Sequence, residues 1–188
     1  MKDTSERLIQ ISMQAFSEKG YHGTSLNNIA ESLSIKKASL YNYINSKDEL
    51  YELCLKQCIK EGMDIIENIN PYSSNMREEF LRFFHEYLFE SDTLVKFYVQ
   101  LSFAPSKFTQ DIEFYNNELS NSFKHKLIEV HEIIKLEMEQ ESFILTIRMF
   151  INGWLYRRAF IQSKSTQNIV KNEFNHHAEM LLNQVMEI

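Results

Sequence analysis

The residues whose types and spacing best indicate a chemical role lie in a short basic and polar run, Lys36, Lys37, Ser39 and Asn42. The major groove of B-DNA admits an α-helix, where a lysine can donate to guanine acceptors and an asparagine can pair with adenine through two hydrogen bonds. If the run lies on the outer face of a helix, these four side chains are available to base edges or to nearby phosphates. The pattern therefore predicts contacts with duplex DNA.

The elements that must position this run are two short helices. The first is predicted from four apolar residues at the spacing of one helical face, Leu26, Ile29, Ala30 and Leu33. Thr24 or Ser25 precedes it as an N-cap, because a hydroxyl can accept from an unpaired backbone N–H. Ser34 interrupts the pattern, Ile35 fills the turn, and Leu40 anchors the second helix inward. Two short helices joined by a tight turn indicate a helix-turn-helix.

Helices are also predicted on both sides of this motif. The preceding one carries Leu8, Ile9, Met13, Ala15 and Phe16. It should end at Gly20, since glycine adopts the left-handed conformation at a helix C-terminus with little steric cost. The following helix should begin at Ser46, because Ser46 and Glu49 have the spacing of a capping box. That cap would fix the direction of Lys47.

The stretch AFSEKGYHGTSLNNIAESLSIKKASLYNYINSKDELY resembles the N-terminal domain of the tetracycline-repressor (TetR) family of bacterial transcription regulators. The residues at the family's spacing are Phe16, Gly20, Thr24, Ile29, Ala30, Leu40, Tyr41, Tyr43, Ser46, Lys47 and Leu50. The chain departs from the family pattern at Ser34, where a glycine is common, at Lys36, where a serine is usual, and at Ile44, where a phenylalanine is common. Beyond about residue 50 the likeness is limited to length and a helical pattern.

The resemblance implies that Thr24 and Ser25 touch phosphate, while Tyr41, Tyr43 and Lys47 hold the flanking phosphates. The predicted DNA-binding residues are thus Thr24, Ser25, Lys36, Lys37, Ser39, Tyr41, Asn42, Tyr43 and Lys47. Hydroxyl and ammonium groups suit this role, because phosphate contacts orient a protein on the duplex. The resemblance also implies a homodimeric repressor, released from a palindromic operator by a small molecule. It implies a helix-turn-helix domain over 1–47 and a larger effector-binding and dimerisation domain over 48–188.

Composition is consistent with this division. The 188 residues have a net charge of −6, whereas residues 1–47 alone have a net charge of +2. Four glycines and two prolines indicate an all-α chain of about nine helices. No 18-residue apolar run or signal-peptide core is found, so we expect a cytoplasmic protein. We expect no cofactor and no catalytic or metal site, because the six histidines match no zinc motif.

The last two helices are apolar on more than one face, which predicts that a second copy of the chain covers one side of them. The predicted dimer residues are Phe143, Ile147, Ile151, Gly153, Leu155, Phe174, Leu181 and Val185. Gly153 would allow two helices to approach closely. The alternative is a monomer that buries both faces internally.

An effector pocket is predicted in the larger domain from aromatic and amphipathic residues at helical spacing, Phe80, Phe84, Tyr87, Tyr98, Gln100, Phe103 and Trp154. They would suit a small apolar or aromatic molecule, and the alternative for each is an ordinary place in the core. Cys54 and Cys58 are interpreted as small buried hydrophobes. The alternative to a repressor released by a small molecule is a DNA-binding regulator without such an effector, controlled by a protein partner or by cysteine oxidation. A purely structural helical dimer would bind no DNA.

Overall fold

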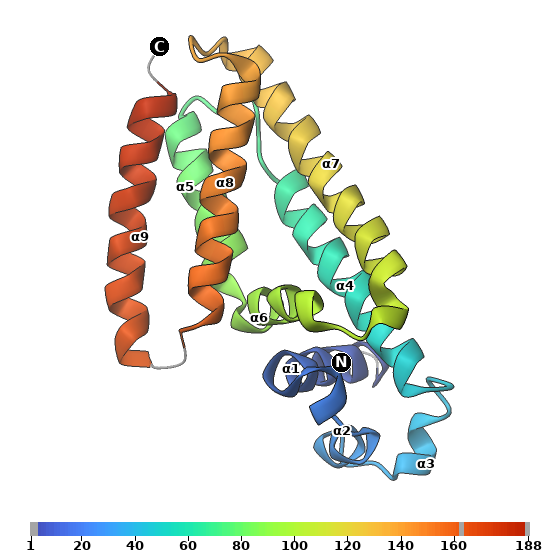
Figure 1. The fold of residues 1–188 in the computed structure, drawn as a ribbon. Coiled ribbons are helices and arrows are strands. Elements are labelled where there is room, and N and C mark those ends of the chain that lie inside the picture. Colours follow the sequence, from blue (N-terminus) through green and yellow to red (C-terminus); the bar gives the residue numbers. More distant parts are fainter. Residues whose placement is uncertain (1–3, 162–163, 187–188) are drawn as a thin grey trace. The chain divides into compact units, whose positions relative to one another are not determined.

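Helices make up the whole framework of the computed structural model, which describes residues 4–161 and 164–186 (Figure 1). In chain order they are α1 (Thr4–Gly23), α2 (Leu26–Ser32), α3 (Lys37–Leu40), α4 (Lys47–Glu67), α5 (Met76–His85), α6 (Asp92–Gln100), α7 (Thr109–Ile134), α8 (Gln140–Ala159) and α9 (Lys164–Val185). A π-helical turn, Glu86–Glu90, follows α5, and two 3-10 turns, Leu101–Phe103 and Ser106–Phe108, join α6 to α7. The described residues contain no β-strand, which confirms the prediction of an all-α chain of about nine helices.

The chain divides into two compact units. The first consists of the residues up to Glu61 together with Thr93–Asn117, and the second of Gly62–Asp92 together with the residues from Glu118 onward. The first unit thus contains the helix-turn-helix, most of α4, nearly all of α6 and the beginning of α7. The functional division predicted at residue 47 stays a prediction. None of the described helices combines the length and the apolar character needed to span a bilayer.

Aromatic packing forms the centre of the first unit. Phe16 of α1 and Tyr51 of α4 meet edge to face, with ring centroids 5.0 Å apart. Tyr51 also lies 5.7 Å from Phe97 of α6 and 4.8 Å from Phe108, which ends the turn before α7. Each fully buried side chain of this size contributes roughly 1.5–3 kcal/mol to stability. The start of α4, which carries the predicted phosphate contact Lys47, therefore shares a core with residues 46 and 57 positions further along the chain than Tyr51.

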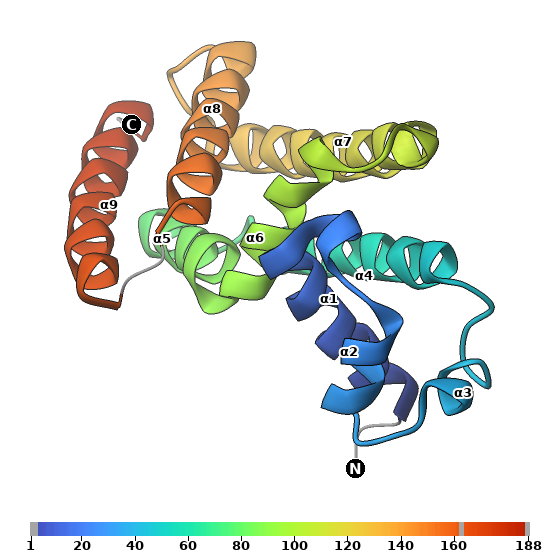
Figure 2. The same cartoon turned by 60° about the horizontal axis from the view of Figure 1, so that its bottom comes forward.

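The sequence predicts that the first helix ends at Gly20, whereas in the structure Gly20 interrupts α1 and the helix ends at Gly23. Its φ of 65° and ψ of −179° are non-helical and belong to a region that only glycine enters readily. The chain then makes one more helical turn to Gly23 before α2 begins (Figure 2). The bend at Gly20 thus lies inside α1, three residues before the helix ends at Gly23.

Phenylalanines dominate the core of the second unit. Phe84 of α5 contacts Phe150 of α8 and Phe174 of α9, with centroid distances of 5.2 and 6.3 Å, so α5 packs against both C-terminal helices (Figure 1). Gly62, near the end of α4, faces Leu119 of α7, and a Cβ atom at Gly62 would lie 3.2 Å from a leucine methyl group. The missing side chain permits this close approach of the two helices.

A buried arginine stabilises the end of the π-helical turn. Arg158 of α8 is only 4% exposed. Its Nε donates to the Leu88 carbonyl at 3.0 Å, it forms an ion pair with Asp92, and its guanidinium lies 4.6 Å from the Phe89 ring. A buried charge is tolerated when it is paired and hydrogen-bonded in this way. No sequence pattern had indicated this residue.

Candidate nucleic-acid interface

The turn of the helix-turn-helix depends on a left-handed serine. Ser25 caps α2 by accepting from the Asn28 N–H at 3.2 Å, and so the N-cap is Ser25 rather than Thr24. After α2, Ser34 has a φ of 58°. Its N–H donates to the Glu31 carbonyl at 2.9 Å, and the next N–H, that of Ile35, donates to the Ala30 carbonyl at 3.0 Å. The serine adopts the left-handed conformation for which the family commonly uses a glycine.

The predicted recognition helix, α3, is a single short turn held by one apolar anchor. Leu40 is completely buried, and Lys36 is the N-cap residue. On the opposite side Lys36, Lys37 and Asn42 are exposed, and Ser39 is half-buried. The predicted outer face is therefore solvent-accessible, although its contact with base edges stays a prediction.

Two tyrosines flank this face. Tyr41 is 51% exposed and Tyr43 is 42% exposed. Between and beyond them, Leu40 and Ile44 are buried and keep the backbone in place. The exposed phenol hydroxyls are suited to the phosphate contacts that the family resemblance implies.

Thr24 differs from the other predicted contacts because its side chain faces inward. It is 3% exposed, and its hydroxyl donates to the carbonyls of Gly20 at 2.8 Å and Ala15 at 3.0 Å. The hydroxyl therefore joins the end of α1 to the start of α2. A phosphate contact at this position would have to come from the backbone N–H, whereas the neighbouring Ser25 is exposed.

The start of α4 is capped almost as predicted. The Glu49 N–H donates to the Ser46 hydroxyl at 3.1 Å, as in a capping box. The Glu49 carboxylate reaches one residue further back than expected and accepts from the backbone N–H of Asn45 and from its side-chain amide. The cap fixes α4 to begin at Lys47.

Around Lys47 the structure brings together charged groups that the sequence keeps far apart. The Lys47 ammonium lies 4.3 Å from the centroid of the Tyr21 ring, and burial lowers the pKa of Lys47, with Asp48 acting in the opposite direction. The Tyr21 hydroxyl donates to Asp48. Lys107 donates to the same carboxylate at 2.5 Å and to the Tyr21 oxygen at 3.1 Å. We call Tyr21, Lys47, Asp48 and Lys107 the Tyr21 cluster; the sequence analysis identified only Lys47.

The predicted effector-pocket residues fall in both units. Phe80, Phe84 and Trp154 are buried among the aromatic rings of the second unit, and Tyr87 is half-buried there. The other three belong to the first unit, where Tyr98 and Gln100 are half-buried and Phe103 is 72% exposed. A shared pocket for these seven residues stays a prediction.

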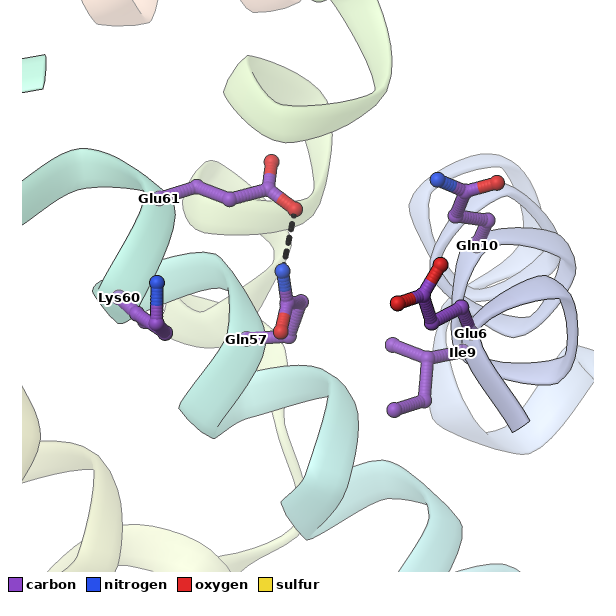
Figure 3. A pocket seen from close by; sticks show the side chains of 6 residues that line it. All are labelled: Glu6, Ile9, Gln10, Gln57, Lys60 and Glu61. Atoms are coloured by element: carbon purple, nitrogen blue, oxygen red, sulfur yellow. Dashed lines mark hydrogen bonds between the residues drawn. The ribbon is translucent and has the colours of Figure 1, made fainter. Parts of the chain in front are cut away.

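A hollow of about 440 Å³ lies between α1 and α4 within the first unit (Figure 3). Its lining residues are Glu6, Ile9, Gln10, Gln57, Lys60 and Glu61. Gln57 donates to Glu61 at 2.8 Å. The lining is mostly polar, and it shares no residue with the aromatic pocket predicted for the effector.

Most of the residues predicted for the dimer interface are buried within one chain. Of the eight, six are at most 5% exposed: Phe143, Ile147, Ile151, Leu155, Phe174 and Val185. Leu181 is half-buried, and Gly153 is exposed with open space around it. These six residues therefore belong to the core of the second unit. They are not available to a partner, because their own chain already covers them.

A different apolar stripe remains exposed on the same two helices. Leu145, Met149 and Tyr156 of α8 are 53–63% exposed, and Ile169 and Met180 of α9 are 68% and 57% exposed. Their intervals of four, seven and eleven residues place each set on one helical face. These side chains, rather than the buried six, are available to a second copy of the chain.

The two cysteines are buried side chains of α4. Cys54 is 0% and Cys58 3% exposed, which confirms their interpretation as small buried hydrophobes. Cys54 Sγ lies 3.8 Å from the Ile9 carbonyl. Burial raises the pKa of both thiols, which disfavours the thiolate that oxidants attack.

Comparisons with known proteins agree with this geometry. The family model "Bacterial regulatory proteins, tetR family" matches residues 8–54, and "Tetracyclin repressor-like, C-terminal domain" matches residues 72–184. The chain is 32% identical over 185 residues to the negative transcriptional regulator IcaR of the biofilm operon icaADBC from Staphylococcus epidermidis, covering 97% of each chain. It is 33% identical over 187 residues to IcaR of Staphylococcus aureus strain Newman, again covering 97% of each chain.

Solved structures share the fold at low sequence identity. A transcriptional regulator from Rhodococcus sp. Rha1 has a TM-score of 0.74 at 12% identity, covering 99% of this chain and 100% of that chain. A TetR-family regulator from Mesorhizobium loti has a TM-score of 0.66 at 16% identity, covering 96% and 95%. The matched family and the IcaR relatives are DNA-binding transcriptional regulators and not enzymes. Both halves of the sequence and the whole fold therefore lead to one conclusion: the chain belongs to the TetR family of bacterial transcriptional regulators.

Proposed function

We propose that the protein is a homodimeric repressor that recognises a pseudo-palindromic operator through α3. The proposal rests on the exposure of the polar residues in and around α3. Lys36, Lys37 and Asn42 are exposed to solvent, while the buried side chain of Leu40 anchors the helix in the domain. The relatives named as negative regulators support repression rather than activation. The same group of residues would provide both base recognition and orientation.

Within this proposal the side chains have separate roles. Asn42 and the lysine pair contact base edges or nearby backbone, because their donors and acceptors match those in the major groove. Tyr41, Tyr43 and Lys47 contact the flanking phosphates and carry no sequence information themselves. The small positive charge of the N-terminal region makes affinity salt-sensitive and makes two copies necessary for tight binding.

The second copy would cover the exposed stripe on α8 and α9. Leu145, Met149 and Tyr156 on one helix and Ile169 and Met180 on the other offer a self-complementary apolar surface. Two such helix pairs form a four-helix bundle with a two-fold axis, the common arrangement of homodimers. Two recognition helices related by this axis would meet half-sites roughly 34–36 Å apart.

Release by a small molecule completes the proposal. An effector needs only to favour the arrangement of the domains that does not bind DNA, with a coupling free energy of typically about 1–3 kcal/mol. The alternative of control by cysteine oxidation is disfavoured by the burial of Cys54 and Cys58. Control by a protein partner, the other alternative, would leave affinity for the operator unchanged by any small molecule.

The test uses the full-length chain and a duplex that it selects from a random-sequence pool. We expect selection of an inverted repeat and a dimer in analytical ultracentrifugation. Met149→Glu should give monomers and weaken operator binding, because it places two like charges in the apolar seam. Phe114→Glu, at an exposed apolar residue outside this stripe, is the matched control and should remain dimeric. A wild-type chain that is monomeric at micromolar concentration, or that enriches no sequence, would refute the proposal.

A further inference from the structure

Asp48 places a carboxylate next to the ammonium group that is predicted to contact phosphate. It follows Lys47 directly in the sequence and lies in the first turn of α4, where a negative charge stabilises the helix N-terminus. Its side chain is 43% exposed. A carboxylate at this position opposes DNA binding in two ways, because it repels phosphate and because it can form an ion pair with Lys47.

Two other members of the Tyr21 cluster, Lys107 and Tyr21, already form hydrogen bonds with the Asp48 carboxylate. Lys107 donates to Oδ2 of Asp48 at 2.5 Å, and the Tyr21 hydroxyl donates to Oδ1. These two hydrogen bonds lower the pKa of Asp48 and keep it charged, with Lys107 as the larger cause. Lys47, in contrast, rests on the Tyr21 ring through a cation–π contact, and it forms no ion pair among the described residues. Its N–H donors therefore remain available.

The position of Lys107 is fixed by its neighbour in the turn before α7. Phe108 is buried, and its ring lies 4.8 Å from Tyr51 and 5.3 Å from Tyr21. The aromatic packing of Phe108 thus fixes the backbone from which Lys107 extends. The Lys107 ammonium lies 4.9 Å from the Tyr21 ring centroid, so two lysines share this ring. The arrangement is built by packing and does not depend on the ion pair alone.

We propose that Lys107 is a positioning residue for operator binding: it neutralises Asp48 and so leaves the Lys47 ammonium free to meet a DNA phosphate. The inference rests on the proposed phosphate contact of Lys47. Lys107 itself does not touch DNA. Without Lys107, the Asp48 carboxylate pairs with Lys47 and its remaining charge repels the nearest phosphate.

The experiment measures affinity of the full-length protein, by fluorescence anisotropy, for the duplex that the wild-type chain selects from a random pool. Lys107→Met should weaken binding by about fivefold for each DNA-binding head, the upper range for an exposed charge pair. In the Asp48→Asn background the same substitution should have no effect, because there is no carboxylate left to neutralise. Lys107→Arg should retain wild-type affinity. Lys56→Met, which removes an exposed charge from α4, is the matched control.

Two readouts separate positioning from other roles. If the cluster were only a structural clamp, Asp48→Asn would weaken binding as much as Lys107→Met does, whereas we expect Asp48→Asn to bind as tightly as the wild type or more tightly. If Lys107 touched phosphate itself, Lys107→Met would weaken binding and reduce the slope of log affinity against log salt by about 0.9 even in the Asp48→Asn background, where no carboxylate remains to pair with Lys47. Either result overturns the inference. A wild-type protein that selects no duplex would refute the proposed function instead.

Discussion

The turn residue Ser34 allows the sharpest test of how this helix-turn-helix is held together. Its φ of 58° places a side chain in the left-handed region, which costs an L-residue other than glycine roughly 1–2 kcal/mol. Ser34→Gly removes that cost but increases the conformational entropy of the unfolded chain, an opposing effect of roughly 0.5–1 kcal/mol. The Ser34 side chain is exposed, so little packing is lost. We expect a net gain in the free energy of unfolding of about 0.5–1 kcal/mol.

Urea denaturation followed by circular dichroism, with thermal unfolding beside it, measures this gain. For a chain of this length, 1 kcal/mol corresponds to a rise in Tm of roughly 2–4 °C. Ser34→Ala keeps a Cβ atom in the same conformation and should show no gain. Lys135→Gly tests the same effect at a second site, because Lys135 also has a positive φ, 52°, and lies in the other compact unit. The two glycine substitutions are distant in sequence and should have additive effects.

The opposite sign for Ser34→Gly would refute this reasoning. An ordinary glycine substitution destabilises a helical protein by about 1 kcal/mol, and such a loss would mean that the left-handed conformation carries no strain. Operator affinity gives an independent check, since Ser34 lies in the turn and outside the predicted base contacts. We expect the selected sequence to be the same for Ser34→Gly and for the wild type.

Three further predictions concern recognition, the thiols and the buried arginine. Asn42→Ala should cost about 1–3 kcal/mol on the selected duplex and relax its base preference; equal losses on every duplex would exclude base recognition by Asn42. Cys54 and Cys58 should resist thiol reagents until the protein unfolds, and diamide should leave operator affinity unchanged. Because burial raises the pKa of both thiols above that of the unfolded chain, their contribution to stability should be lost as the pH rises past about 8.5, an effect absent when both are replaced by alanine. Arg158→Leu should lower the free energy of unfolding by about 2 kcal/mol, because the buried Leu88 carbonyl loses its donor; urea denaturation measures it, and no change would mean that water replaces the guanidinium.

Local patterns in the sequence were sufficient for the helix-turn-helix. The apolar spacing that gave α2, the cap at Ser46 and the glycine at position 20 each depend on backbone geometry within a few residues, and each is found in the structure. The exposure of Lys36 and Lys37 followed from the same periodicity. Such features are predictable because one helical turn decides them.

Assignments that depended on distant packing were less accurate. Periodicity identified apolar stripes on α8 and α9, but it could not determine which stripe the chain's own core covers, and six predicted dimer residues are in that core. Thr24 was predicted to touch phosphate, yet its hydroxyl donates to the carbonyls of Ala15 and Gly20 in α1. In both cases the side chain's surroundings come from another helix, which a local pattern does not describe.

The sequence by itself determined the all-helical class, the recognition motif and the family, because these depend on residue types and on spacings of three to seven positions. Only the tertiary structure decided that Lys107 meets Asp48, and that Arg158 meets the Leu88 carbonyl. These partners are 59 and 70 positions apart, and no periodicity connects them. Contacts across such separations are set by how whole helices pack, and packing minimises the free energy of the complete chain rather than of any one segment.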